Sequence, residues 1–285
     1  MKSGHDSIAV RYAFLVSNLT PYYGSGEAGS IARIVFEDAF QLRDGKSSGA
    51  FPEQYRPRFD EILERLLLRE PVQYILGQAD FYGYKFEVDR RVLIPRQETE
   101  ELVHWVLESC KAEALDGKRL LEVGSGSGCI PIVLGKKRPE LEIVSVDVSE
   151  GALNVARRNG ERLGASIDWR RLDFLDPATW GGLGVFDLLV SNPPYIDPSE
   201  REHIPAHVFE FEPHQALFTE NNPMEFYKSF AQFSSDYMKE SGEVFLECNE
   251  FRINEVSELF KKTGHETIEA RRDMNGKYRM MMIIK

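Results

Sequence analysis

Apolar residues in the first part of the chain recur with the period of an α-helix. One stripe of them alternates with Glu and Arg, which is typical of a helix that packs one face against a core. Another helix is predicted near Ile31 to Leu42, with Ser30 as its N-cap, and residues 44–49 between the two helices are predicted as a loop. The pattern indicates a small helical domain over residues 1–78. The stripe consists of Phe59, Ile62, Leu63, Leu66 and Leu67.

The pattern changes character over residues 79–97. Phe81 to Val88 is aromatic and partly alternating, Asp89 to Arg91 has the polarity of a turn, and Val92 to Ile94 is apolar again. This order predicts a β-hairpin. We expect the hairpin to link the helical domain to a second domain at 98–285.

Helical and strand-like patterns alternate from residue 98 to the end of the chain. Leu120 to Val123 is a short apolar strand that runs into glycines, and Phe186 to Val190 is strongly strand-like. Such alternation predicts an α/β fold with a doubly wound, mostly parallel sheet, which binds ligands at the carboxyl ends of its strands. Further strands are predicted at 143–146, 167–169, 243–246 and around Ile268 and Met280. Helices are predicted at 102–110, from Cys129, after Ser149, at 224–238 and at 253–261.

Composition narrows the class of partner. The 285 residues carry a net charge of −11, whereas proteins that bind a nucleic-acid backbone usually show a basic face. The run Lys136-Lys137-Arg138 ends a predicted helix, where cations complement the helix dipole. We find no apolar run long enough for a membrane span, no signal-peptide core before Arg11, and three isolated cysteines that fit a reducing compartment. These features predict a cytoplasmic protein.

The strand at 120–123 runs into a glycine-rich loop. Glycines directly after a buried strand let the backbone turn tightly and approach a ligand. The third glycine comes one residue earlier than the dinucleotide fingerprint requires, and Cys129 occupies that place, which disfavours a nicotinamide cofactor. A plain tight turn is the structural alternative. The predicted cofactor-binding residues of the loop are Gly124, Ser125, Gly126, Ser127 and Gly128.

Two further carboxylates follow predicted strands. Asp147, 23 residues beyond Gly124, is placed to accept hydrogen bonds from two ribose hydroxyls, although it could instead cap the next helix. Because Ser149 can cap that helix alone, we favour the ribose role. Asp173 and Phe174 could bind an adenine amino group and stack on its ring, or could be a surface Asp beside a buried Phe.

The segment Asn192-Pro193-Pro194-Tyr195 comes directly after the strand at 186–190. The prolines stiffen the backbone and remove two N–H donors, which leaves carbonyl oxygens facing any cleft at the strand end. A planar nitrogen is a weak nucleophile because its lone pair is delocalised. The Asn192 side-chain oxygen and the Pro193 carbonyl could grip its N–H groups and stabilise the positive charge that develops during methylation. Tyr195 could pack over the flat group, whereas a rigid turn is the structural alternative.

These motifs together resemble the HemK/PrmC family of peptide chain release factor glutamine methyltransferases, and the resemblance covers nearly the whole chain. It includes Leu93-Ile94-Pro95-Arg96 with Glu98-Thr99-Glu100, the loop Ser191 to Asp197, and Phe211-Glu212-Pro213 with Ala216-Leu217. The chain departs from the family pattern at three places. They are Gln97, Glu122 and Cys248-Asn249.

The resemblance implies a Rossmann-like methyltransferase sheet that uses S-adenosylmethionine, and an N-terminal helical domain that binds the protein substrate. It implies that Gly124 to Gly128, Asp147, Phe174 and Asn192 contact the cofactor. Asn192 to Tyr195 would hold the glutamine of the Gly-Gly-Gln motif in class I release factors, and no membrane or direct nucleic-acid partner is expected.

Other functions remain open on the catalytic loop alone. A ribosomal-protein glutamine methyltransferase or an adenine-N6 methyltransferase would use the same kind of loop, and a non-catalytic cofactor-binding scaffold is the non-enzyme alternative. A metal site at His203 and His207 is disfavoured because Pro205 interrupts the helix that would align them. We therefore expect no metal, and we interpret Cys129 as a packing residue.

Overall fold

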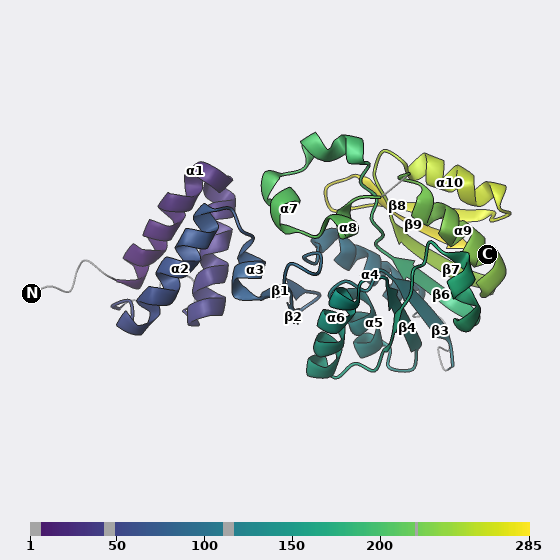
Figure 1. The fold of residues 1–285 in the computed structure, drawn as a ribbon, viewed down its shortest axis with the longest axis horizontal. Coiled ribbons are helices and arrows are strands. Elements are labelled where there is room, and N and C mark those ends of the chain that lie inside the picture. Colours follow the sequence, from purple (N-terminus) through teal and green to yellow (C-terminus); the bar gives the residue numbers. More distant parts are fainter. Residues whose placement is uncertain (1–6, 43–48, 111–116, 220–221) are drawn as a thin grey trace, which may run out of the picture. The chain divides into compact units, whose positions relative to one another are not determined.

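The computed structural model describes residues 7–42, 49–110, 117–219 and 222–285 (Figure 1). The chain forms two compact units, one within residues 1–78 together with 205–211, and the other comprising residues 79–204 and 212–285. Most of the predicted loop at 44–49 lies outside the described residues.

The first unit is helical, but its first helix begins earlier than predicted. Helix α1 spans Ile8–Ile34, and the side chain of its N-cap, Ser7, accepts a hydrogen bond from the Val10 N–H. Ser30 is therefore not an N-cap: it lies inside α1, where its hydroxyl donates to the Gly26 carbonyl. Pro21 and several glycines make this stretch look like a boundary. The chain instead takes non-helical angles only at Gly24, while the buried Leu15, Leu19 and Ala28 pack both parts of α1 into the core.

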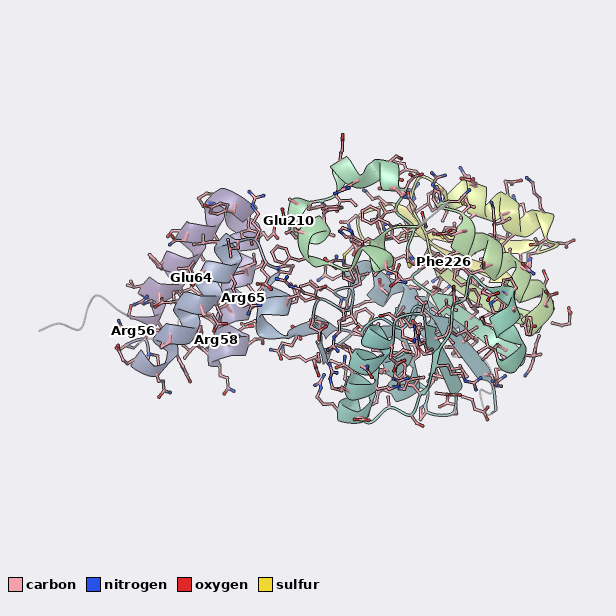
Figure 2. The ribbon with its side chains drawn as sticks, in the orientation of Figure 1. Arg56, Arg58, Glu64, Arg65, Glu210 and Phe226 are labelled. Atoms are coloured by element: carbon pink, nitrogen blue, oxygen red, sulfur yellow. The ribbon has the colours of Figure 1, made fainter. Side chains whose placement is uncertain are left out.

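Aromatic side chains form the core of this unit. The rings of Phe36, Phe40, Phe51 and Phe59 lie 5.5 to 6.3 Å apart between centroids. The predicted helix around Phe59 is confirmed as α2, Arg56–Leu67. Figure 2 labels Arg58 and Arg65 on α2. Arg58 forms an ion pair with Glu61, and Arg65 forms one with Glu70. The remaining elements are η1 (Val35–Ala39), η3 (Glu53–Tyr55), α3 (Val72–Leu76) and α7 (Ala206–Phe211).

The predicted hairpin is present, but its turn lies elsewhere. Strands β1 (Gln78–Phe81) and β2 (Tyr84–Glu87) form a two-stranded sheet. The turn is at Tyr82 and Gly83, which have φ values of 50° and 79°. Such positive values fit the tight turn that matches the twist of a hairpin. The predicted turn at 89–91 is present, closed by a hydrogen bond from the Val92 N–H to the Asp89 carbonyl at 3.0 Å. The strand predicted at 92–94 does not form, because the closing strand of the hairpin is β2.

The second unit contains a seven-stranded sheet in the order β5-β4-β3-β6-β7-β9-β8 (Figure 1). The five strands β3 to β7 run parallel, and β8 and β9 pair antiparallel at one edge. This order confirms the predicted doubly wound α/β fold. The bounds are β3 Arg119–Val123, β4 Glu142–Asp147, β5 Asp168–Arg171, β6 Phe186–Ser191, β7 Met238–Glu247, β8 Thr267–Arg272 and β9 Tyr278–Ile284.

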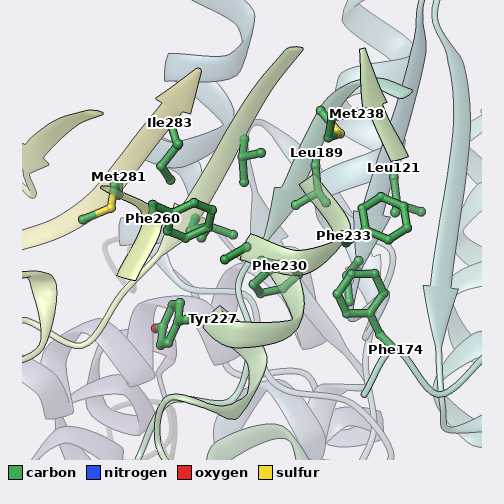
Figure 3. Close-up of a cluster of buried hydrophobic side chains, with 14 of the residues drawn as sticks. Leu121, Phe174, Leu189, Tyr227, Phe230, Phe233, Met238, Phe260, Met281 and Ile283 are labelled. Atoms are coloured by element: carbon green, nitrogen blue, oxygen red, sulfur yellow. The ribbon is translucent and has the colours of Figure 1, made fainter. Parts of the chain in front are cut away.

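Helices cover both faces of the sheet because alternate strand residues point to opposite sides. On one face, Leu121 and Leu189 share a buried cluster with Phe230 and Phe233 of α9 (Glu225–Tyr237), as Figure 3 shows. Helix α10 (Ile253–Lys262) contributes to the same cluster. Leu120 and its neighbours face the other way. They pack against α4 (Gln97–Ser109) and α5 (Cys129–Lys137), with α6 (Glu150–Leu163) beside α5. The short helices of this unit are η4 (Pro177–Gly182), η5 (Pro198–His203) and α8 (His214–Leu217).

The core position of Phe233 gives a test of this packing. Its ring is fully buried and contacts Phe174, Trp180 and Tyr237. We expect Phe233→Ala to lower the free energy of unfolding by roughly 3–5 kcal/mol, because it removes buried surface and leaves a cavity. Urea unfolding measures the change. Phe251→Ala is the matched control: Phe251 is 82% exposed, so its loss should cost less than about 0.5 kcal/mol. Equal costs for the two variants would contradict this packing.

Candidate active site

A cavity of about 470 Å³ lies at the carboxyl ends of the parallel strands, where the fold predicts a ligand. The loops that follow β3, β4, β5 and β6 supply much of its wall, and all lining residues belong to the second unit. The lining segments are 91–93, 95–96, Thr99, 122–127, 129–130, 146–149, Ala152, 172–175, 191–194, Pro213, 215–216, Phe218 and 225–226.

The glycine-rich loop after β3 is held by backbone hydrogen bonds. The N–H groups of Gly124 and Ser125 donate to the Val146 carbonyl at 2.8 and 3.2 Å. Gly124 has φ +89°, and a Cβ built there would lie 3.8 Å from the carbonyl oxygen of Asn192. The glycine loop and the start of the Asn-Pro-Pro-Tyr segment therefore lie side by side on the cavity wall.

Gly128 differs from the rest of this loop. It does not line the cavity, whereas Gly124, Ser125, Gly126 and Ser127 do. Gly128 has φ +80°, and a Cβ there would lie 2.9 Å from the Trp169 ring and 3.0 Å from Ile132. The residue at 128 must be small because α5 and β5 meet there, and the predicted contact of Gly128 with the cofactor stays a prediction.

Asp147 lines the cavity and also braces the glycine loop. Its Oδ2 accepts a hydrogen bond from the Gly126 N–H at 3.0 Å, and its Oδ1 accepts one from the Ser149 N–H at 2.8 Å. Burial raises the pKa of this carboxyl. Ser149 caps α6, because its side chain accepts from the Ala152 N–H. Asp147 is therefore not needed as the side-chain cap.

Asp173 and Phe174 both line the cavity, but Phe174 is largely a core residue. It is 3% exposed, and its ring packs against those of Trp180 and Phe230 at 5.3 and 5.1 Å between centroids. Phe226 on α9, labelled in Figure 2, lines the cavity and is less buried. The sequence analysis missed Phe226 because an aromatic residue in an amphipathic helix carries the same pattern as a core residue.

Glu122 is fully buried at the end of β3. Its Oε2 accepts a hydrogen bond from the Ser145 hydroxyl, which in turn contacts the Ser125 hydroxyl. Its Oε1 has no hydrogen-bond partner among the described residues, although Glu122 lines the cavity. Burial raises the pKa of Glu122 to about 8. A ligand that carries polar N–H or O–H groups would satisfy this oxygen, so the site fits a cofactor such as S-adenosylmethionine.

The first three residues of the Asn-Pro-Pro-Tyr segment line the cavity, whereas the fourth packs against the core. Asn192, Pro193 and Pro194 line the cavity, and the Asn192 Nδ2 donates to the Thr99 hydroxyl at 3.0 Å. Tyr195 does not line the cavity. Its hydroxyl donates to Glu247 at 3.2 Å and accepts from Arg279 at 3.4 Å, while burial raises its pKa. The expectation that Tyr195 packs over the substrate stays a prediction, and its hydroxyl is held by Glu247 and Arg279.

Three residues that support the site carried no clear signal in the sequence. Asn159 is fully buried: its Nδ2 donates to the carbonyls of Ser127 and Glu87, and its Oδ1 accepts from the Glu87 N–H. This clamp ties the glycine loop to β2. Thr99 and Glu247 meet at the base of the Asn192 loop.

The segment that carries the acidic and histidine residues around 200–212 is divided into two short helices. Among the described residues, no group of three or more His, Cys, Asp and Glu side chains could hold a metal ion. Helix η5 ends at His203 and α7 begins at Ala206, as Pro205 predicted. Glu212 is 4% exposed and accepts hydrogen bonds from Arg96 and the Ile94 N–H. It therefore anchors the segment before α4.

The sheet order, the glycine loop and the carboxylate at the end of β4 define an S-adenosylmethionine-dependent methyltransferase. Residues 103–219 match the family model described as "Methyltransferase small domain". The solved structure of a methyltransferase from Pyrococcus furiosus is 19% identical, with a TM-score of 0.51 over 79% of this chain and 98% of that chain. At this identity, the likeness concerns the fold alone. None of the helices within the described ranges is long and apolar enough to cross a membrane.

Curated relatives narrow the family. The release factor glutamine methyltransferase of Streptococcus pneumoniae is 35% identical over 232 residues, which is 81% of each chain. That of Bacteroides thetaiotaomicron is 36% identical over 223 residues, or 78% of each chain. That of Koribacter versatilis is 38% identical over 72% of this chain and 71% of its own length. The chain belongs to the release factor glutamine methyltransferase family.

The raised pKa of Glu122 predicts a pH-dependent stability. The folded protein holds a proton up to about pH 8, whereas the unfolded chain releases it near the ordinary Glu pKa of 4.5. This contribution to stability is therefore fully present below about pH 4.5 and is lost as the pH rises through about 8. Between about pH 4.5 and pH 8, the free energy of unfolding of wild type should fall by up to about 1.4 kcal/mol per pH unit relative to that of Glu122→Gln, whose side chain stays neutral.

Urea unfolding of both proteins without added cofactor, at several pH values between about 5 and 8, measures this difference. A free-energy difference between wild type and Glu122→Gln that does not change with pH would show that Glu122 is already ionised in the folded protein.

Proposed function

We propose that this enzyme transfers a methyl group from S-adenosylmethionine to the side-chain nitrogen, N5, of the glutamine in the Gly-Gly-Gln motif of class I release factors. The observation that carries the proposal is the position of Asn192 to Pro194 on the cavity wall, directly beside the glycine loop. The names of the relatives support this choice of substrate. Since release factors act with the ribosome, we place the reaction in the cytoplasm.

The chain supplies binding and orientation. Gly124 to Ser127 bring their backbone to the cavity, the carboxylate of Asp147 suits two ribose hydroxyls, and Glu122 offers its free oxygen to a polar group of the cofactor. When bound, the cofactor supplies a methyl group made electrophilic by a positively charged sulfur. We assign Asp173 and Phe174 to the cofactor site because they line the same cavity.

The amide nitrogen of glutamine needs help because its lone pair is shared with the carbonyl. The Asn192 Oδ1 and the Pro193 carbonyl are acceptors that can hold its two N–H groups. Transfer of the methyl group would place positive charge on the nitrogen, which would then release one of its two protons to water. The nitrogen becomes more positive during this step, so acceptors that face it stabilise the transition state more than the ground state.

We also propose that the helical unit, residues 1–78, binds the protein substrate. It has its own aromatic core, and it contributes none of the described residues that line the cavity. A compact unit with no part in the cavity wall is better suited to recognising a folded partner than to chemistry.

Transfer from labelled S-adenosylmethionine tests the substrate. Wild-type enzyme should label an intact release factor on the motif glutamine, as located by mass spectrometry of its peptides. The same factor with that glutamine replaced by Ala is the matched control and should remain unlabelled. Labelling of a ribosomal protein or of adenine in DNA, with none on the release factor, would overturn the substrate while leaving the chemistry of nitrogen methylation in place.

Asn192→Ala tests the grip on the nitrogen. We expect kcat to fall by on the order of 10²–10³-fold, as when an oxyanion-hole donor is removed, because one of the two acceptors is lost. Calorimetric titration should find the affinity for S-adenosylhomocysteine changed by no more than a few-fold. An equally large loss of cofactor affinity would mean that Asn192 serves the cofactor and not the substrate.

A further inference from the structure

A threonine hydroxyl lies between the catalytic loop and a buried carboxylate. Thr99 of α4 donates to the Glu247 Oε2 at 2.7 Å and accepts from the Asn192 Nδ2 at 3.0 Å. Thr99 and Glu247 are 3% and 2% exposed. Asn192 directly after β6, Thr99 of α4 and Glu247 of β7 thus form one chain of hydrogen bonds with a defined direction.

The direction of this chain follows from the number of protons on the hydroxyl. A threonine has one O–H to donate, and here Glu247 accepts it, so towards Asn192 the hydroxyl can act only as an acceptor. It must therefore meet the amide nitrogen of Asn192. The side-chain oxygen of Asn192 is left to serve the cavity, which Asn192 and Thr99 both line.

We propose that Thr99 and Glu247 are positioning residues that fix the orientation of the Asn192 amide, so that its oxygen and not its nitrogen meets the substrate nitrogen. This inference rests on the proposed function, and it adds two residues that touch neither the reacting nitrogen nor the methyl group. If the amide were reversed, its Oδ1 would face an oxygen with no proton to offer. Its NH₂ group would then face the N–H groups of the substrate, and the acceptor would be lost.

The other end of the catalytic loop reaches the same carboxylate. The hydroxyl of Tyr195 donates to the Glu247 Oε1, so both carboxylate oxygens accept hydrogen bonds from different elements. A carboxylate that accepts at both oxygens cannot easily donate towards Thr99. This arrangement explains why Tyr195 turns away from the cavity: it helps to hold the carboxylate that orients Asn192.

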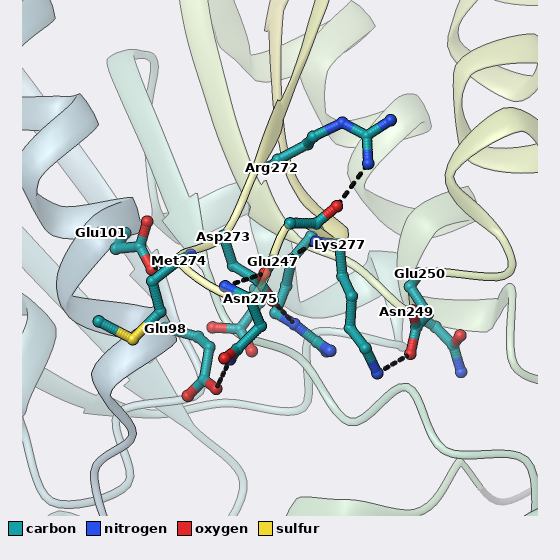
Figure 4. Close-up of polar contacts among 12 residues, drawn as sticks. Glu98, Glu101, Glu247, Asn249, Glu250, Arg272, Asp273, Met274, Asn275 and Lys277 are labelled. Atoms are coloured by element: carbon teal, nitrogen blue, oxygen red, sulfur yellow. Dashed lines mark hydrogen bonds and ion pairs between the residues drawn. The ribbon is translucent and has the colours of Figure 1, made fainter.

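The turn between β8 and β9 lies near Glu247 and α4, as Figure 4 shows. Arg279 donates to Tyr195 and pairs with Asp273 at 2.9 Å. The Met274 N–H donates to Glu101 of α4, the helix that also carries Thr99. Arg279, Tyr195 and α4 are therefore held in fixed positions relative to one another. This limits the freedom of Glu247 to move away from Thr99.

A double-mutant cycle tests the proposal. Thr99→Val keeps the shape but removes the hydroxyl, and should lower kcat by about tenfold or more, with little change in affinity for S-adenosylhomocysteine. Thr99→Ser keeps the hydroxyl and should recover most of that loss. If Thr99 acts through Asn192, then Thr99→Val should change kcat by less than about twofold in an Asn192→Ala background. A tenfold loss in that background would overturn the proposal.

Glu247→Gln provides a second variant if Thr99→Val folds poorly. It places a side chain of the same size that can donate towards Thr99, which would free the threonine proton for the Asn192 oxygen. Its loss of kcat should also vanish in the Asn192→Ala background. An undiminished loss there would contradict the positioning role.

An NMR measurement separates this inference from the proposed function because it needs no substrate. The side-chain NH₂ group of Asn192 should show slowed hydrogen exchange in wild type and Thr99→Ser, and faster exchange in Thr99→Val. Equal exchange in all three proteins would refute the inference even if release factor is methylated. Slowed exchange in an enzyme that leaves release factor unlabelled would uphold the orientation of Asn192 and overturn only the substrate.

Discussion

The carboxylate of Glu247, at the end of β7, is the interaction on which the catalytic loop depends. It accepts one hydrogen bond from Thr99 of α4 and another from Tyr195, and so reaches Asn192 through Thr99. Burial raises the pKa of this carboxyl, since a charge inside the protein loses its hydration. The hydrogen bond from Thr99, the nearby Arg279 and the hydrogen bond from Tyr195 act in the opposite direction on this pKa. The direction of the hydrogen bonds that pass through Thr99 follows from this acceptor.

A second buried carboxyl, that of Glu122, lines the cavity itself, whereas Glu247 does not. Glu122 has one oxygen bound by Ser145 and the other without a partner among the described residues, and its pKa is raised to about 8. Burial therefore favours its neutral form, which can both donate and accept a hydrogen bond. The cavity thus joins Asn192, whose amide nitrogen is held by Thr99, to Glu122, which keeps polar capacity for a ligand. This difference matches a site that must orient a substrate and also bind a polar cofactor.

Much of the fold could be predicted from the sequence because the pattern of apolar residues repeats locally. The alternation after residue 98 gave the parallel sheet, and the loop after β6 was predicted at its carboxyl edge. The errors came from local signals that allow two readings. Ser30 has the chemistry of a cap but lies inside α1, and the turn of the hairpin lies at Tyr82 and Gly83.

The site was harder to predict wherever partners are distant along the chain. Thr99 lies 93 residues from Asn192 and 148 from Glu247, so no spacing links them. Tyr195 and Gly128 were each one or two residues from cavity residues, yet one turns into the core and the other fills a packing contact. Which side of a loop faces a ligand depends on tertiary packing, and only the folded chain determines it.

The most direct test of the central claim is a crystal structure of the enzyme with S-adenosylhomocysteine and a release factor carrying its Gly-Gly-Gln motif. The account predicts the glutamine side-chain nitrogen at about 2.7–3.2 Å from both the Asn192 Oδ1 and the Pro193 carbonyl, with the Asn192 Nδ2 still on Thr99. A glutamine whose oxygen, and not its nitrogen, faces Asn192 would contradict it.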